Sequence, residues 1–227
     1  AGVASTAMCG IIGIVSRPPT RATPEAGFLI AELDRASTSI ISTPADVVAA
    51  SGHARVVDEA LRGLPGVLAL VGHVDVVAAI IARLDQLDAA TSAIEHRLDT
   101  NVDGLDAERL ERANAELIEF KDALWAIRHD RLRTTREVEA LAGRDAPESA
   151  LGGYLAVQQA FSAIDRLEVR GRDSAGLHVF VWGHDIDSDA LATLVADRGV
   201  DPLFQSGAVV DTGACLSFVY KAAAEIG

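Results

Sequence analysis

The segment MCGIIGIV, residues 8–15, decides the expected fold. Apart from two glycines it is apolar and rich in β-branched residues, and it ends at SRPP, residues 16–19. A short run of this kind, closed by a double proline, predicts a buried β-strand followed by a loop. Cys9 then lies at the start of the strand, and Gly10 beside it allows a close approach of backbone or substrate.

Cys9 could act as a nucleophile if it becomes the first residue of the mature chain. A cysteine thiol has a pKa of about 8.5 and needs help to ionise at neutral pH. A free α-amine has a pKa of about 7.7–8.0 and can serve as the general base. Removal of residues 1–8 as a leader would therefore let Cys9 supply both nucleophile and base. The structural alternative is an inert buried cysteine, because free cysteines are often buried.

A second informative segment is LEVRGRDSAG, residues 167–176. An amphipathic helix is expected over residues 154–169, directly before its arginine, and a strand over residues 177–182 directly after it. The segment therefore lies in a helix-to-strand connection.

The two segments, in this order, resemble the class II glutamine amidotransferases. The second is similar to the glucosamine-6-phosphate synthase signature LEYRGYDSAG, with Val169 and Arg172 in place of two tyrosines. The resemblance covers about seven residues at Cys9 and about twenty-five around Arg170, and motif matches of this length are hypotheses. It implies a four-layer αββα sandwich, the fold of the N-terminal-nucleophile hydrolases.

The family resemblance also implies roles for individual residues. Cys9 would be the catalytic nucleophile that attacks the side-chain amide of glutamine, and Arg170 and Gly171 would shape the substrate pocket. Gly10, Asp173 and Ser174 would be supporting residues. The alternative for Arg170 is a surface ion pair with a neighbouring carboxylate, and Asp and Ser favour turns on local grounds.

The partners also follow from the resemblance. The released ammonia would pass to a sugar phosphate, most simply fructose 6-phosphate, bound by an isomerase-type domain C-terminal to this chain. No cofactor or metal is implied, and a homo-oligomer is expected.

The spacing of the two segments departs from the family. They lie 170 − 9 = 161 residues apart instead of about two dozen, which predicts an insertion over residues 17–150. Residues 9–16 and 151–227 would then form the amidotransferase domain. The family's arginine-tryptophan, asparagine-glycine and glutamine-binding aspartate motifs are not found in this sequence, so we expect the domain to continue beyond Gly227.

The predicted insertion is helical. Thr23 and Thr43 each precede a proline and are expected to cap helices, the second of which is broken at residues 63–66. Apolar steps of three and four over residues 77–98 and 110–141, separated by a turn at residues 99–104, predict an antiparallel helical hairpin with Asp106 as a cap. Shorter helices would pack at its base. Arg131 and Thr134 interrupt the second seam.

Composition excludes several functions. The net charge of -13 disfavours binding to nucleic acid, and no apolar run approaches the length of a membrane span. Two distant cysteines do not form a disulfide framework, which favours the reducing cytoplasm. The six histidines lack metal-ligand spacing. Cys215, His178 and His184 are expected to be structural or ordinary polar positions.

Two other functions remain open at this stage. The domain could be catalytically silent, with the helical insertion serving oligomerisation or partner docking. It could also belong to a branch of the same class with a different acceptor.

Overall fold

The computed structural model describes residues 11–40, 44–167, 174–198 and 208–223. It divides into two compact units. The helical unit is Val15–Gln158, and the sheet unit consists of Ala1–Ile14 together with Gln159–Gly227. The corresponding prediction was an insertion over residues 17–150.

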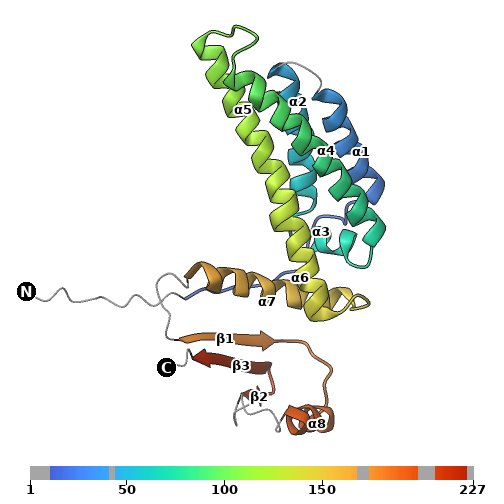
Figure 1. Ribbon diagram of the computed structural model, residues 1–227. Coiled ribbons are helices and arrows are strands. Elements are labelled where there is room, and N and C mark those ends of the chain that lie inside the picture. The colour runs from blue at the N-terminus through green and yellow to red at the C-terminus, as the bar shows by residue number, and fades with distance from the viewer. Residues whose placement is uncertain (1–10, 41–43, 168–173, 199–207, 224–227) are drawn as a thin grey trace, which may run out of the picture. The chain divides into compact units, whose positions relative to one another are not determined.

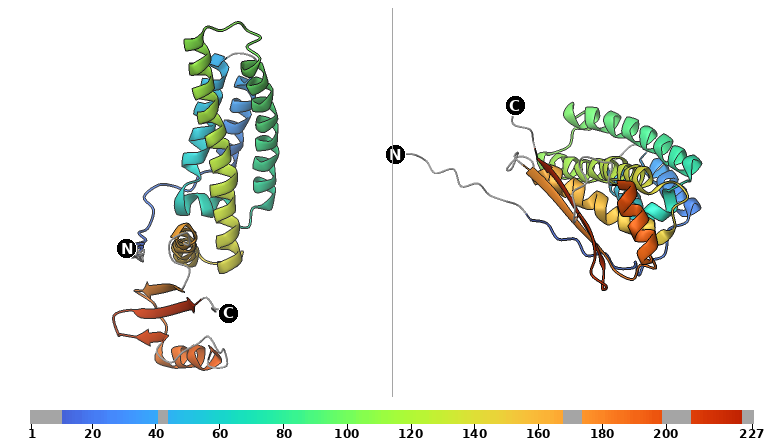
Figure 2. Two further views of the ribbon diagram at one scale, coloured as in Figure 1. Left: turned by 60° about the vertical axis from the view of Figure 1, so that its left-hand side comes forward. Right: turned by 90° about the horizontal axis from the view of Figure 1, so that it is seen from below.

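Four helices form the body of the helical unit: α1 (Ala26–Ser39), α2 (Pro44–Ala60), α4 (Val74–Asp99) and α5 (Ala107–Trp125). Helix α1 packs on α2, α2 on α5, α5 on α4 and α4 on α1 (Figures 1 and 2). Each helix contributes an apolar stripe to a common core, because residues three and four apart share one face of a helix. Its largest fully buried members are Leu29, Leu33, Val47, Val57, Leu70, Ile80, Leu84, Leu87, Phe120 and Ile127.

The predicted hairpin is one half of this four-helix bundle. Helices α4 and α5 do pack against each other on either side of the expected turn. Helices α1 and α2, however, lie along the hairpin and not at its base. The reason is that their own apolar stripes, from Leu29 to Ala36 and from Val47 to Leu61, are buried over most of their length.

Two of the predicted helix starts can be compared with the structure. Asp106 caps α5 by accepting a hydrogen bond from the backbone N–H of Arg109, as predicted. The cap at Thr23 was wrong, because α1 begins at Ala26 after an extended Glu25. Before this helix, the Arg21 guanidinium donates to the carbonyls of Glu59 and Arg62 and so attaches the preceding segment to the end of α2.

A second cluster closes one end of the unit. Helix α3 (Gly63–Leu70), helix α6 (Arg133–Ala142) and the beginning of α7 (Glu148–Leu167) bury Val67, Val71, Val138, Leu151 and Leu155 among themselves. The expected break at residues 63–66 is in fact the first turn of α3, where proline is tolerated because its missing N–H has no intrahelical partner. Gly66 lies so close to α2 that an added Cβ would be 1.9 Å from the carbonyl oxygen of Leu61.

The sheet unit contains the end of α7, strand β1 (Ser174–Val181), helix α8 (Ser188–Arg198), strand β2 (Val209–Asp211) and strand β3 (Leu216–Ala223). Its strands form an antiparallel sheet in the order β1-β3-β2. The β1–β3 ladder runs from Ser174 opposite Ala223 to Val181 opposite Leu216. The αββα sandwich needs two facing sheets, so it stays a prediction.

The strand predicted at residues 8–15 is not present over its described part, residues 11–15. Residues 11–16 have no regular secondary structure, and Ile11 and Val15 are 95% and 85% exposed. A strand needs a neighbour for its backbone hydrogen bonds, and the three described strands pair only with one another. High β-propensity alone does not supply that neighbour.

Candidate functional site

Most of the predicted site residues lie outside the described part of the chain. This holds for Cys9, Gly10, Arg170, Gly171 and Asp173. Ser174 is the first residue of β1, with its Cα opposite that of Ala223. Residues 168–173 connect the end of α7 at Leu167 to this strand, so the arginine-containing segment does lie between a helix and a strand.

The sheet unit presents a row of aromatic side chains on β1. The His178 and Phe180 rings are 3.9 Å apart between centroids, and Phe180 and Trp182 are 5.7 Å apart. His178 Nε2 lies 2.7 Å from the Ser217 hydroxyl on β3. Alternate residues of a strand share one face, which explains why these three side chains meet. Phe180 and Trp182 in this row are substantially exposed.

Cys215 and His184 occupy different settings. Cys215 is buried in the turn before β3, where its backbone N–H donates to the Thr212 hydroxyl and its carbonyl accepts from the backbone N–H of Thr212. These contacts are those of a turn residue. His184 Nδ1 is buried and has no hydrogen-bond partner within the described ranges.

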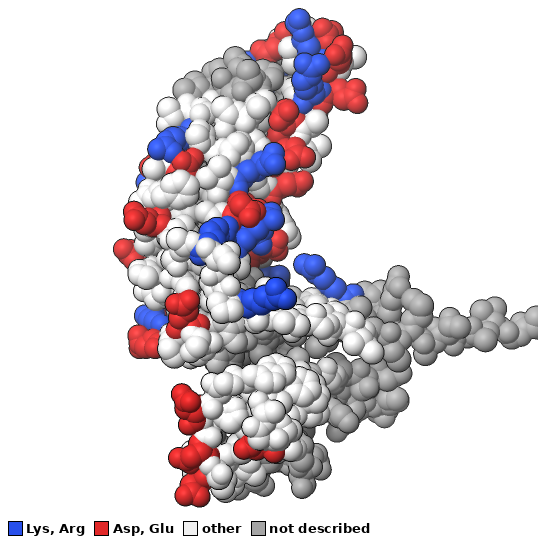
Figure 3. All heavy atoms as spheres, turned by 180° about the vertical axis from the view of Figure 1, so that it is seen from behind, with Lys and Arg blue, Asp and Glu red and all other residues white. Residues whose placement is uncertain are grey.

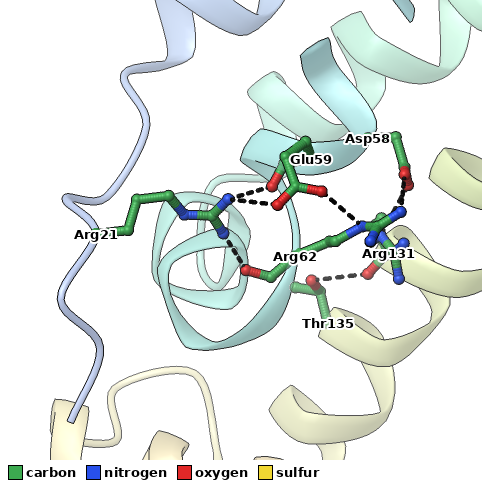
Figure 4. A network of polar contacts seen from close by, with 6 residues as sticks. All are labelled: Arg21, Asp58, Glu59, Arg62, Arg131 and Thr135. Atoms are coloured by element: carbon green, nitrogen blue, oxygen red, sulfur yellow. Dashed lines mark hydrogen bonds and ion pairs between the residues drawn. The ribbon is translucent and has the colours of Figure 1, made fainter. Parts of the chain in front are cut away.

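The helical unit contains a charge network that the sequence reasoning did not identify (Figure 4). Asp58 on α2 is nearly buried, and its two carboxylate oxygens accept from Arg62 Nη2 and Arg131 Nε, each at 2.9 Å. The hydrogen bond and charge of Asp58 raise the pKa of the Arg62 guanidinium above its ordinary value. Arg21 and Glu59 extend the network to the surface.

A second buried carboxylate, Glu32, joins α1 to α2. One of its oxygens lies 2.7 Å from His53 Nδ1, and the other accepts from Arg35. A carboxylate that orients an imidazole is common in catalytic and metal sites. Across the described ranges, however, no group of three or more His, Cys, Asp or Glu side chains could hold a metal ion. The Glu32–His53 pair joins α1 to α2, two helices that pack on each other.

The surface of the helical unit carries both signs of charge. In Figure 3 its Lys and Arg side chains lie beside Asp and Glu, with no extended basic patch on the face shown. Interhelical pairs such as Lys121–Glu95 and Arg128–Asp85 account for part of this pattern. In the described ranges no single helix is long and apolar enough to cross a membrane. Helices α3 and α4 pass that test only as a pair, bent by 107°.

Comparison with known proteins gives no further assignment, since the chain matches no protein-family model, no curated protein and no solved structure.

Proposed function

We propose that this chain carries the glutaminase half of a class II glutamine amidotransferase, with Cys9 as the nucleophile. The observation that carries the proposal is the presence of two signature-like segments in the family's order, MCGIIGI at residues 8–14 and LEVRGRDSAG at residues 167–176. Each segment alone is short. The two segments together, in the family's order, are far more specific for this family than either segment alone.

The division of the chain supports this proposal. The described residues 11–14 are grouped in one compact unit with the residues from Gln159 onward, although the 158 − 15 + 1 = 144 residues of the helical unit lie between them in sequence. An insertion between the two segments of one domain has this consequence, and long insertions are tolerated in surface connections.

The reaction follows from the chemistry of an N-terminal cysteine. The α-amine takes the thiol proton, and the thiolate attacks the side-chain carbonyl carbon of glutamine. The carbon–nitrogen bond breaks, the α-ammonium group returns its proton, and ammonia leaves a glutamyl thioester. Water then cleaves the carbon–sulfur bond, which releases glutamate and restores the thiol.

The test is covalent labelling of the intact protein with a glutamine-mimicking diazoketone, followed by peptide mass spectrometry. We expect Cys9 to be labelled, glutamine to protect it, and the same preparation to release glutamate from glutamine. Cys215→Ser is the matched control, and it should retain both properties because Cys215 is a buried turn residue. Labelling elsewhere, or no glutamate release by folded intact protein, would refute the proposal.

The proposed base makes a second test possible. An acylated amine cannot accept a proton, so the active protein should begin at Cys9. Intact-mass measurement of fully active protein should show that residues 1–8 have been removed. Full activity with those residues still attached would exclude the α-amine as the base.

The ammonia acceptor is proposed from the amino-acid sequence of the second segment alone. Of the class II branches, the glucosamine-6-phosphate synthase signature is the one that Glu168–Gly176 resembles. The intact protein should therefore make an amino sugar phosphate from glutamine and fructose 6-phosphate. Glutamine hydrolysis without this product would keep the glutaminase and exclude this acceptor.

A further inference from the structure

Helices α5 and α6 are parts of one helical run that is interrupted by a π-helix, η1 (Ala126–Leu132). A π-helix is rare, because each of its turns takes up an additional residue. Such turns persist only where surrounding contacts favour them.

The burial pattern shows a change of phase at η1. Before it, buried residues recur at steps of three and four, ending with Phe120, Leu124 and Ile127. The next buried residues are Leu132, five positions on, and Thr135. In an uninterrupted α-helix, steps of three and four would instead place Arg131 and Thr134, the two residues that interrupt the predicted seam, on the core side. One residue corresponds to a rotation of about 100° around the helix.

The change of phase serves two separate cores. Leu132 packs in the four-helix core, whereas Val138 and Ala142 pack in the second cluster with residues of α3 and α7. Leu141, which the unshifted pattern would bury, is 41% exposed. The run therefore faces one core before η1 and serves a second core after it.

One charged contact lies directly at the change of phase. Arg131 Nε on η1 donates to Asp58 Oδ1 on α2 at 2.9 Å, and the Arg131 carbonyl accepts from the Thr135 hydroxyl at 3.0 Å (Figure 4). Asp58 is 7% exposed, so loss of Arg131 would leave its charge compensated by Arg62 alone. Arg62 binds the same carboxylate but lies between α2 and α3, four residues from Asp58 in sequence.

We propose that η1 is a phase adapter and that the Asp58–Arg131 ion pair holds it in place. The pair keeps Leu132 inward and so fixes which face of α6 meets α3 and α7. This inference rests on the fold of the helical unit and is independent of the proposed glutaminase function.

Thiol accessibility tests the adapter. Leu141→Cys and Ala142→Cys are introduced separately, and their alkylation rates in the intact protein are measured by peptide mass spectrometry. With Asp58 present, position 141 should react faster than position 142. With Asp58→Ala, we expect the ratio of the two rates to fall by about tenfold, because loss of a buried ion-pair partner is large enough to shift a two-state population that far.

The rate at position 141 separates a change of phase from loss of stability. General destabilisation raises the rate at position 142 and leaves that at position 141 nearly unchanged, because position 141 is already exposed. A change of phase also lowers the rate at position 141, so an unchanged rate there would overturn the proposal. Arg62→Ala is the matched control, because it removes the other partner of Asp58 and should leave the ratio as it was. A fall as large as that of Asp58→Ala would show that Arg131 is not the relevant contact.

Two further variants keep the test decisive if Asp58→Ala does not fold. Arg131→Lys keeps the charge but loses the planar guanidinium, so the ratio should fall by a smaller factor. Deletion of Asp130 removes the additional residue, and an ordinary α-helix then turns Leu132 inward, so the native ratio should be retained. An unchanged ratio in the first variant, or a reversed ratio in the second, would contradict the adapter.

Discussion

The two units of this chain differ in how far they satisfy their own apolar residues. In the helical unit, four helices bury a continuous core, and the largest buried side chain, Phe120, is completely enclosed. In the sheet unit, Cys215 and Leu216 are the buried apolar residues of the described strands and turns, whereas Trp182, Tyr220 and Phe180 are exposed. The well-packed core and the predicted chemistry therefore lie in different units. The unit that packs best carries none of the predicted catalytic residues.

The difference has a physical basis. Helices satisfy their backbone hydrogen bonds internally, so an amphipathic set of four needs only to turn its apolar stripes together. A small antiparallel sheet instead needs neighbouring strands for its backbone hydrogen bonds and a cover on at least one face. The exposed aromatic row on β1 shows that the described elements leave part of one face uncovered.

The largest expected effect falls in the sheet unit, on chemistry and not on stability. Cys9→Ala should lower glutamine-dependent activity of the intact protein by at least about 10³-fold, as expected when a nucleophile is lost. Activity with added ammonia should survive, because Cys9 acts only in releasing ammonia. Parallel assays with glutamine and ammonium salts check this. Equal loss of both activities would indicate a structural role for Cys9.

A matched pair of phenylalanines tests the difference in packing. Phe120→Ala should destabilise the helical unit by about 3–5 kcal/mol, because it leaves a cavity in a close-packed core. Phe180→Ala should cost less than about 1 kcal/mol, because the ring is already 45% exposed. Chemical denaturation of both variants measures the two values. Similar costs would mean that the β1 aromatic row is as well packed as the bundle.

A pair of glycines sharpens the same comparison within the helical unit. Gly66→Ala should cost about 1–3 kcal/mol, because the new methyl group would overlap the Leu61 backbone and push α3 away from α2. Gly153 on α7 has nothing within 4 Å of an added Cβ. Gly153→Ala should therefore raise stability by about 0.5–1 kcal/mol. Thermal melts of the two variants should shift in opposite directions, and a shared direction would contradict the close approach at Gly66.

The helices could be predicted from the sequence because helical periodicity is a local property. The stripes of α4 and α5 and the turn between them follow from spacing alone. The π-helix could not be predicted in this way, because its partner Asp58 is 131 − 58 = 73 residues away in sequence. The interruption of the seam at Arg131 was its one local sign. The Glu32–His53 pair was missed for the same reason, since it forms only when α1 packs on α2.

For the candidate site, the sequence predicts functional residues but not the structure that surrounds them. Cys9 and Arg170 were identified by resemblance and not by spacing, and they lie outside the described residues. The neighbouring run at residues 11–15 was wrongly assigned to a strand, because β-propensity says nothing about whether a partner strand is available. Local sequence therefore predicts a chemistry for these residues but not the structure around them.

The smallest expected effect concerns Asp106 and Thr23, which were both predicted to cap helices. Asp106 accepts a hydrogen bond from the Arg109 backbone N–H at 2.9 Å, whereas Thr23 lies before an extended segment and caps nothing. Asp106→Ala should therefore cost about 1 kcal/mol, and Thr23→Ala should change stability by less than about 0.5 kcal/mol. Asp106→Asn keeps the side-chain acceptor and should recover most of the loss. Denaturant midpoints of the three variants measure these differences in stability. A cost at Thr23 equal to that at Asp106 would mean that α1 begins earlier than Ala26, and that Arg21 does not hold the preceding segment extended.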